Sequence, residues 1–235
     1  MASEVLFERI EKKYLMSKKQ YSGFLKCMEP YMQIDEFGDH TVMSLYYDTE
    51  HWDLIRRSIE KPVFKEKLRL RSYGTPGETD PVYIELKRKY HGVVYKRRRE
   101  MTLMEARKLL SEGVPAEETD QVLREIGYFL DFYRPLTPHM LISCERAAYY
   151  SKSGPKIRLT IDRNIRARET ELDLAKGDDG TLLFPDERFL MELKIEGSMP
   201  LWIAKALSEL KLYPGGFSKY GRFYMKKMKE ETENV

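Results

Sequence analysis

The chain has 235 residues, of which 42% are hydrophobic, and its 41 basic and 38 acidic side chains give a formal charge of only +3. The apolar content is sufficient for a packed core and excludes a chain that is disordered throughout. The near balance of charge speaks against a nucleic-acid binder that relies on bulk positive charge, so any anion site must be a local arrangement of cations.

Eight segments have alternating or β-rich patterns and are expected as strands: residues 5–15, 41–48, 63–73, 81–90, 93–101, 138–151, 155–165 and 188–196. His91 and Gly92 predict a hairpin turn between two of these segments, because glycine accepts a positive φ. Residues 153–155 mark a second turn.

Helical periodicity occupies the gaps between the strands. The first expected helix covers residues 18–32 after the cap Ser17, and the second runs through Trp52, Ile55 and Ile59 after Asp48 or Thr49. The third begins at Thr102, which forms a capping box with Glu105, and ends near Gly113. The remaining helices are residues 117–131, residues 200–211 with Pro200 in the first turn, and a last helix from Ser218 towards Lys229.

No long linker, repeat or low-complexity segment divides the chain. We therefore expect one α+β domain over residues 1–235, with its last few residues frayed. Its core would be an antiparallel sheet of about eight strands, large enough to close into a β-barrel with flanking helices.

Several of these strands carry charge on one face and aliphatic side chains on the other. Residues 65–71, KEKLRLR, place four cations on one face at intervals of roughly 6.6 Å. Similar alternation occurs in residues 82–87, 157–162 and 190–195. For a single strand, the ordinary interpretation is a charged face in bulk water. Adjacent like charges otherwise need carboxylate partners or a bound polyanion.

For eight strands together, five or six helices would cover the apolar faces and the charged faces would point inward. The closed sheet would then enclose a solvated tunnel lined by Lys, Arg and a few carboxylates, which needs water, counter-ions or an anionic ligand. A triphosphate or polyphosphate fits such a tunnel. Nucleic acid fits less well, since a duplex is too wide and the strand faces lack aromatic residues for base stacking.

The two cysteines, Cys27 and Cys144, have no metal-ligand spacing. They fit a reducing cytosol, with a single disulfide as the alternative. No apolar run approaches the roughly 18 residues of a membrane span, and no signal-peptide core follows Met1. We expect a cytoplasmic protein, held at the inner face of the membrane if a membrane-protein partner recruits it. The histidines lack zinc-like spacing, and no P-loop or Rossmann pattern is present.

The segment Arg9-x-Glu11-x-Lys13-Tyr14 resembles the first strand of the triphosphate tunnel metalloenzymes (the CYTH-like superfamily), whose common pattern is Glu-x-Glu-x-Lys. Further segments resemble the VTC-domain polyphosphate polymerases of that superfamily: residues 68–74 (LRLRSYG), 84–87 (IELK), 95–98 (YKRR), 145–149 (ERAAY), 157–162 (IRLTID), 191–194 (MELK) and 217–220 (FSKY). The resemblance extends from about residue 6 to residue 224.

One departure from the family pattern concerns Arg9. It occupies the position where the hydrolytic tunnel enzymes usually have their first metal-binding glutamate. The substitution removes one carboxylate from the metal set and adds a cation, which favours the polymerase branch over a two-metal triphosphatase.

The resemblance also implies which residues act. The catalytic residues would be Lys13, Arg69, Arg71, Lys87, Arg146, Arg158, Glu192 and Lys219. The phosphate-binding residues would be Lys13, Arg69, Arg71, Lys87, Lys96, Arg98, Arg146, Arg158, Lys194, Ser218 and Lys219. Arg offers a planar fork to phosphate oxygens and Lys a compact point charge.

For each of these cations the alternative is an ordinary surface residue. That alternative is strongest for Lys96, because the neighbouring Arg97, Arg98 and Arg99 leave the inward parity open. Lys65 and Lys67 are expected near the tunnel mouth or paired with carboxylates. Ser218 and Lys219 stand at an expected helix start, which suits a terminal phosphate or is a plain N-cap.

The implied metal is Mn²⁺ or Mg²⁺, which takes oxygen ligands and binds through one or two carboxylates plus substrate phosphates. Glu192 is the expected ligand. Glu11 and Glu85 would assist directly or through water, or would instead pair with neighbouring lysines.

The resemblance therefore implies a metal-dependent polyphosphate polymerase that transfers the γ-phosphate of ATP onto a growing inorganic polyphosphate chain and releases ADP. Two alternatives stay open: an inorganic or nucleoside triphosphatase of the same fold, and a non-catalytic polyphosphate-binding subunit. ATP and inorganic polyphosphate are the expected partners, with no nucleic acid. The sequence does not indicate the oligomeric state.

Overall fold

Strands and helices alternate through the computed structural model, which describes residues 9–115, 117–154 and 156–233. In chain order the elements are β1 (Arg9–Ser17), α1 (Lys18–Met28), β2 (Met32–Asp48), α2 (Asp53–Ile59), β3 (Phe64–Tyr73), β4 (Pro81–Tyr90), β5 (Val93–Thr102), α3 (Leu103–Glu112), α4 (Gln121–Phe132), β6 (Thr137–Ser151), β7 (Ile157–Arg168), a 3₁₀ turn (Leu174–Lys176), β8 (Thr181–Leu182), β9 (Arg188–Glu196), α5 (Leu201–Glu209) and α6 (Lys219–Glu233).

The strands form one nine-stranded sheet in the order β1-β9-β7-β6-β2-β3-β4-β5, and β8 pairs with β7 outside this path. The pairs described by register are antiparallel. The α+β class and the antiparallel sheet are therefore as the sequence predicts. Over the described residues no pairing joins the end strands β1 and β5, so the sheet is not closed into the expected barrel.

Several element boundaries differ from the expected ones. β2 begins at Met32 rather than at residue 41, because sheet pairing extends the strand through a polar segment that shows no strict alternation. α1 ends at Met28, and α4 begins after Asp120. The side chain of Asp120 accepts hydrogen bonds from the first-turn amides of α4 and fixes its start. The two-residue strand β8 was not predicted.

The caps predicted at Ser17 and Thr102 are present, whereas α2 has Trp52 at its N-cap position, without a side-chain cap hydrogen bond. Ser17 with Gln20 and Thr102 with Glu105 each form a capping box. The predicted turn at His91 and Gly92 has φ values of 44° and 87°. Gly154 of the second turn also has a positive φ; Pro155 lies outside the described residues.

The chain packs into two compact units, each assembled from separate segments. Unit 1 comprises the described residues of Met1–His40, Cys144–Ile165 and Phe184–Phe217, and unit 2 those of Thr41–Ser143, Arg166–Leu183 and Ser218–Val235. A single domain over the whole chain stays a prediction. α6 continues to Glu233, and the last two residues, for which fraying was expected, lie outside the described part of the chain.

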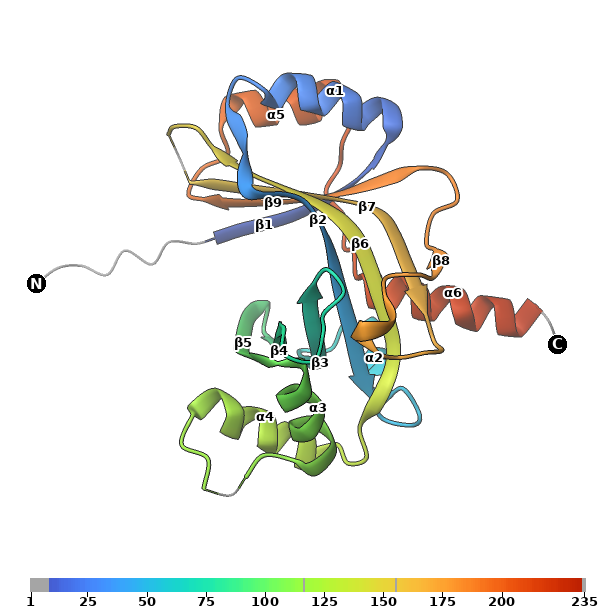
Figure 1. Cartoon of the computed structure of the whole chain (residues 1–235). Coiled ribbons are helices and arrows are strands. Elements are labelled where there is room, and N and C mark those ends of the chain that lie inside the picture. Colours follow the sequence, from blue (N-terminus) through green and yellow to red (C-terminus); the bar gives the residue numbers. More distant parts are fainter. Residues whose placement is uncertain (1–8, 116, 155, 234–235) are drawn as a thin grey trace, which may run out of the picture. The chain divides into compact units, whose positions relative to one another are not determined.

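Unit 1 has its own hydrophobic core. α1 and α5 lie side by side against the apolar face of its strands (Figure 1). Tyr14, Met191 and Leu159 extend into this core from three adjacent strands, and Phe24 and Ile203 meet them from the two helices. The helices cover only one face of these strands, which leaves the opposite face for polar side chains.

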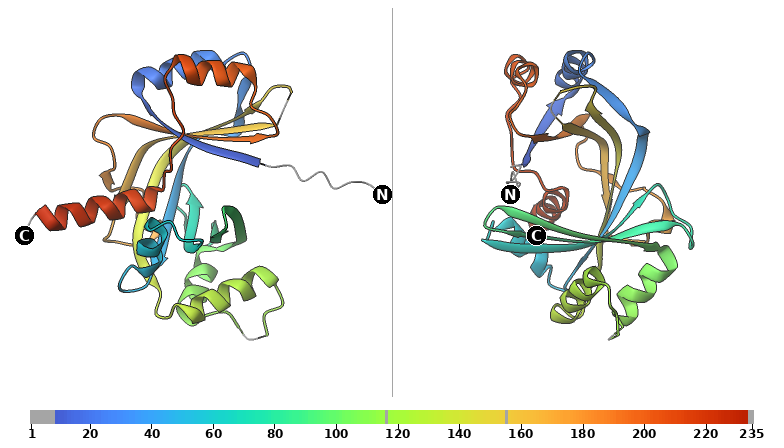
Figure 2. Two further views of the ribbon diagram at one scale, coloured as in Figure 1. Left: turned by 180° about the vertical axis from the view of Figure 1, so that it is seen from behind. Right: turned by 90° about the vertical axis from the view of Figure 1, so that its left-hand side faces the viewer.

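Unit 2 repeats this arrangement with different elements. α3 and α4 pack against the apolar face of β4 and β5 (Figure 2). Leu68 and Ile84 of the strands meet Ala106 and Phe129 of the helices, and all four are almost fully buried. The polar face of β3, β4 and β5 is again the one that these helices leave uncovered.

None of the helices within the described residues is long and apolar enough to cross a membrane. Cys27 and Cys144 are both free thiols.

Candidate functional site

A polar surface of unit 2 is built by the strand register. Arg69 of β3 pairs in register with Glu85 of β4, which in turn pairs with Arg98 of β5. Because alternate side chains of a strand share a face, these residues point to one side together with their i±2 neighbours. The β3–β5 face, as we name it, consists of Lys67, Arg69, Arg71, Glu85, Lys87, Lys96 and Arg98.

Glu85 lies at the centre of the β3–β5 face and is only 1% exposed. Arg69 Nε donates to its Oε2 at 2.7 Å, and Lys96 Nζ lies 2.6 Å from its Oε1. Arg71 and Arg98 approach the same carboxylate at 3.8 and 3.6 Å. Burial raises the pKa of Glu85, but Arg69, Arg71 and Lys96 lower it to about 2. The carboxylate is therefore ionised at neutral pH, with four cationic side chains around it.

Cations outnumber carboxylates on this face despite Glu85. Tyr46 of β2 is buried, which by itself raises the pKa of its phenol, yet Arg69, Lys67 and Arg71 lower that pKa to about 8. Burial together with Arg71 and Arg69 also lowers the pKa of Lys96, although Glu85 opposes the shift. The lowered pKa of Tyr46 indicates an excess of positive charge, which favours a bound anion, whereas the lowered pKa of Lys96 is due first to its burial.

The register places Lys96 on the β3–β5 face, opposite Lys87. Arg98 lies on the same side, with its guanidinium carbon 3.6 Å from the Tyr83 ring centroid and its Nη2 3.3 Å from the Tyr73 hydroxyl. Arg97 points to the opposite face and pairs with Glu125 of α4. The sequence left open which residues of this basic segment share the polar face, and the strand pairing shows that they are Lys96 and Arg98.

The start of α6 also meets this face within unit 2. Ser218 Oγ accepts a hydrogen bond from the Gly221 amide at 3.2 Å, as expected for a helix cap, and another from Lys67 Nζ at 3.1 Å. Lys219 is the first residue of α6 and is half-buried. Lys67, expected near a tunnel mouth, therefore connects β3 to this helix start.

The polar surface of unit 1 is built by β1, β9 and β7. Lys13 pairs in register with Glu192, which pairs with Thr160. Two residues further along these strands, Glu11 pairs with Lys194, which pairs with Arg158. These residues form what we call the β1–β9 face, together with Asp162 of β7 and its ion-pair partner Arg146 of β6.

Glu192 lies between two lysines on this face. Lys194 Nζ is 2.7 Å from its Oε1, and Lys13 Nζ is 3.5 Å from its Oε2. Burial raises the pKa of Glu192, but Lys13, Lys194 and Arg146 lower it to about 2. Lys13 also donates to the carbonyl of Phe217 at 3.1 Å. The Glu192 side chain keeps 19% of its surface exposed, so its oxygens are more accessible than those of Glu85.

Arg146 forms a bidentate pair with Asp162, which is 2% exposed, through contacts of 2.6 and 2.8 Å. Nearby in the register, Thr160 Oγ1 is buried, and no hydrogen-bond partner for it lies within the described residues. A buried hydroxyl in that state usually marks a place for a water or a ligand.

Two further expected residues are more exposed. The Arg158 side chain is 61% exposed and lies 4.0 Å from Asp35. Glu11 is exposed at its place opposite Lys194. Arg9 belongs to β1, but its side chain lies outside what the structure describes. The expected tunnel, which would bring both polar faces to one ligand, stays a prediction.

The three expected metal ligands differ in how well they suit a cation. Among the described residues, no three His, Cys, Asp or Glu side chains cluster in a way that could hold a metal ion. Glu85 is enclosed by four cations, so a divalent ion would have to displace them. Glu192 is ionised, partly exposed and close in register to the buried Thr160 hydroxyl. Of the three, Glu192 is therefore the best suited to a metal that also binds phosphate oxygens, and such an ion would displace Lys194 from Oε1.

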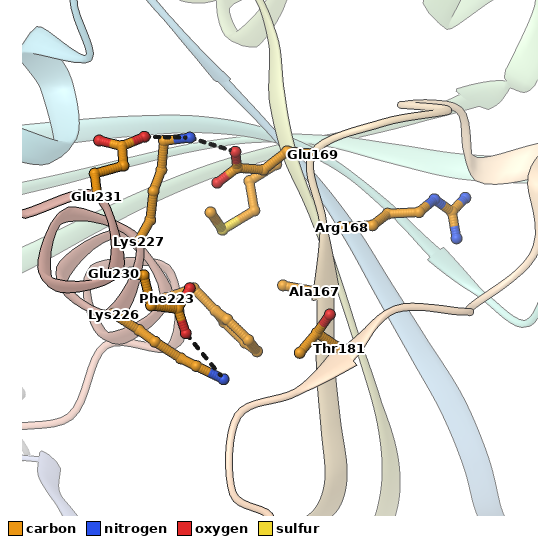
Figure 3. Close-up of a pocket in the computed structure, with 10 residues that line it drawn as sticks. Ala167, Arg168, Glu169, Thr181, Phe223, Lys226, Lys227, Glu230 and Glu231 are labelled. Carbon is orange, nitrogen blue, oxygen red and sulfur yellow. Dashed lines mark hydrogen bonds and ion pairs between the residues drawn. The ribbon is translucent and has the colours of Figure 1, made fainter. Parts of the chain in front are cut away.

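A separate hollow of unit 2 has a different charge pattern (Figure 3). Its lysines are neutralised locally: Lys227 pairs with Glu169 and Glu231, and Lys226 with Glu230. None of the expected site residues lines it. It is therefore a weaker candidate for polyanion binding than the β3–β5 face.

Tyr46 and Asp162 were not predicted as site residues from the sequence. Tyr46 could have been found, because Ser44, Tyr46 and Asp48 alternate with the core residues Met43, Leu45 and Tyr47. Alternation with the core residue Ile161 likewise places Asp162 on a polar face. Its ion pair with Arg146, however, depends on contact between two strands and has no signal in the local sequence.

Comparison with known proteins gives two positive results. The model of the VTC domain family matches residues 8–226. Among solved structures, a Hippeastrum protein whose description combines adenylyl cyclase with a dominant triphosphatase activity is similar at a TM-score of 0.56 and 17% identity, covering 93% of this chain and 96% of that one. A comparison with curated proteins found no match.

Two bacterial structures, each described as an adenylate cyclase, are also similar. The Bacillus halodurans protein has a TM-score of 0.54 at 17% identity, covering 89% of this chain and 93% of that one. The Vibrio parahaemolyticus protein has a TM-score of 0.51 at 14% identity, covering 93% and 98%. At such identities the likeness shows the fold, which is the α+β fold of the triphosphate tunnel proteins.

Proposed function

The chain belongs to the VTC domain family, and from this premise we propose that it is a metal-dependent polyphosphate polymerase. It would transfer the γ-phosphate of ATP onto the end of an inorganic polyphosphate chain. A terminal phosphate oxygen of the chain would attack the γ-phosphorus, the bond to the β-phosphate oxygen would break, and ADP would leave. The attacking oxygen is already an anion at neutral pH, so this step needs no dedicated general base.

The observation that supports the proposal most is the positive β3–β5 face. Four cations surround one buried carboxylate there, and the lowered pKa of Tyr46 reports the remaining positive charge. Phosphoryl transfer relies mainly on positioning and charge stabilisation, which such a face supplies. The proposed phosphate ligands of unit 2 are Arg69, Arg71, Lys87, Lys96, Arg98, Ser218 and Lys219.

In unit 1, the proposed phosphate ligands are Lys13, Arg146, Arg158 and Lys194. Glu192 would hold Mn²⁺ or Mg²⁺, with Glu11 assisting through water. When bound, such an ion neutralises charge that develops on phosphate oxygens. For Glu85, the contacts favour the role of counter-ion that fixes Arg69, Arg71 and Lys96 in place.

The test is incubation of the protein with ATP and Mn²⁺, followed by gel separation of the products. The proposal predicts long polyphosphate chains with ADP. Orthophosphate without chains would instead identify a triphosphatase, and no product together with retained polyphosphate binding would identify a binding subunit.

A further inference from the structure

Tyr46 holds a position on β2 that brings its hydroxyl group to the β3–β5 face. It pairs in register with Arg69, and its oxygen accepts a hydrogen bond from Arg69 Nη1 at 3.0 Å. The same guanidinium donates through Nε to Glu85. Arg69 is therefore held from two sides, by a carboxylate and by a phenol.

The ring of Tyr46 is itself fixed by α6. It stacks on Tyr220 with the ring centroids 4.5 Å apart. Tyr220 in turn donates to the buried carboxylate of Asp48 at 2.8 Å. Asp48 also accepts from the amides of Leu54 and Ile55 at the start of α2. With so few free rotations, the Tyr46 hydroxyl acts as a preorganised partner for Arg69.

We propose that Tyr46 is a positioning residue of the polyanion site, which orients Arg69 through its hydroxyl group and weakens polyanion binding when it loses its proton at alkaline pH. This inference rests on the proposed function only in that the β3–β5 face binds phosphates. It requires no turnover.

The sign of the pH effect follows from linkage. Burial raises the pKa of Tyr46, but Arg69, Lys67 and Arg71 lower it to about 8. A bound polyanion neutralises these cations and raises that pKa again, so the polyanion favours the protonated phenol. Affinity is then highest below the pKa of the free protein and falls as the pH rises through it.

Other groups around Tyr46 do not account for a difference between the wild type and Tyr46→Phe. The charged or titratable side chains that face it or its contacts are Lys67, Arg69, Arg71 and Tyr73 of β3, Asp48 of β2, Tyr220 of α6, His139 of β6, Glu85 of β4 and Lys96 of β5. Burial lowers the pKa of His139, which is thus neutral in the alkaline range. Lys96 and Tyr73, whose pKa values are also lowered, are both retained when Tyr46 alone is replaced.

The experiment measures the affinity for inorganic tripolyphosphate by calorimetry from about pH 7 to pH 9, for the wild type and Tyr46→Phe. Across this range, the wild-type affinity should fall by up to about tenfold more than that of Tyr46→Phe, which removes the ionisable group but keeps the stacked ring. The ratio of the two affinities at each pH cancels the effects of ionisation of the probe and of Lys96, because both proteins share them.

The matched control is Tyr133→Phe. The Tyr133 hydroxyl donates a hydrogen bond to Glu66 at 2.9 Å. Burial is the main cause, and the charge of Glu66 the second, that raises the pKa of Tyr133 to about 12. This variant should keep the wild-type pH profile. Ultraviolet absorbance of tyrosinate in the free protein should show one group ionising near pH 8 that Tyr46→Phe lacks and Tyr133→Phe retains.

The outcomes separate the two proposals. Identical pH profiles for the wild type and Tyr46→Phe would overturn the role of Tyr46 and leave the polymerase proposal standing. Tripolyphosphate binding with the expected pH profile but without chain synthesis would overturn the polymerase proposal and leave the role of Tyr46 standing. Absence of binding at every pH would overturn both.

Discussion

The two polar faces use the same residue types but balance their charges differently. On the β3–β5 face, one carboxylate that is 1% exposed contacts four cations. On the β1–β9 face, Asp162 already neutralises Arg146, and Glu192 stands between two lysines with 19% of its side chain exposed. The first arrangement suits the binding of a polyanion, whereas the second leaves a carboxylate accessible to a metal ion. This difference predicts that changes on the two faces will damage different properties.

The largest effect is expected at Glu192. Glu192→Ala should reduce ADP release by about 100-fold or more, because it removes the proposed metal ligand from the reaction. Metal-free tripolyphosphate affinity should stay the same or rise, since a negative charge leaves a cationic face. Steady-state ADP release and calorimetry measure the two quantities.

The control for this variant is Glu187→Ala, an exposed carboxylate of unit 1 that pairs with Lys18. It should keep wild-type turnover. Full activity of Glu192→Ala would remove Glu192 from the metal site and abolish the functional contrast between the two faces.

Glu85→Gln should instead damage stability. Breaking a buried ion pair by removing one partner typically costs about 3–5 kcal/mol, since the cations are left uncompensated. Tripolyphosphate should recover much of this loss by replacing the missing negative charge. Thermal unfolding with and without tripolyphosphate measures both effects, and Glu112→Gln at the exposed end of α3 is the control. Equal stability of the two variants would contradict the role of Glu85.

The dependence of the unfolding free energy on pH in the acid range offers a second check on Glu85. Its pKa of about 2 in the folded protein lies below the ordinary value of 4.5. Its contribution is therefore complete above the ordinary value and is lost as the pH falls towards the folded one. The difference in unfolding free energy between the wild type and Glu85→Gln should shrink steadily over this interval.

A smaller effect is expected for Arg71→Ala. Arg71 is 11% exposed, and losing its charge-assisted contacts should weaken tripolyphosphate binding by about 10- to 100-fold. Arg158→Ala should cost less, because that side chain is 61% exposed on the β1–β9 face. Calorimetry measures the tripolyphosphate affinity of both variants. A larger loss of affinity for Arg158→Ala would contradict the claim that the β3–β5 face is the main site of polyanion binding.

The smallest effect tests the parity of β5. Arg98→Ala should lower tripolyphosphate affinity by about threefold to tenfold, because the residue lies on the cationic face but is partly exposed. Arg97→Ala should leave the affinity unchanged, since Arg97 points to the opposite face and pairs with Glu125. Equal losses would mean that charge alone, and not the face, determines binding.

Much of this arrangement could be predicted from alternation along the strands. The positions of Arg69, Arg71 and Glu85 on the polar faces of their strands follow from a period of two, because Leu68 and Leu70 of β3 and Ile84 and Leu86 of β4 must point to the core. The antiparallel sheet and the helix caps at Ser17 and Thr102 also have direct sequence signals.

Other features depend on contacts that no local pattern encodes. The parity of Lys96 was open because four consecutive basic residues carry no alternation, and the pairing with β4 decides it. Alternation places Tyr46 on the polar face of β2, but its contact with Arg69 depends on the pairing of β2 with β3. The early start of β2 at Met32 likewise results from sheet pairing and not from hydrophobic alternation.

The most direct test of the central claim is phosphorus NMR of quenched samples from a reaction with ATP and a divalent cation. The polymerase proposal predicts that resonances of internal chain phosphates grow in step with ADP while orthophosphate stays at background. Growth of orthophosphate in step with ADP, without internal phosphates, would contradict it.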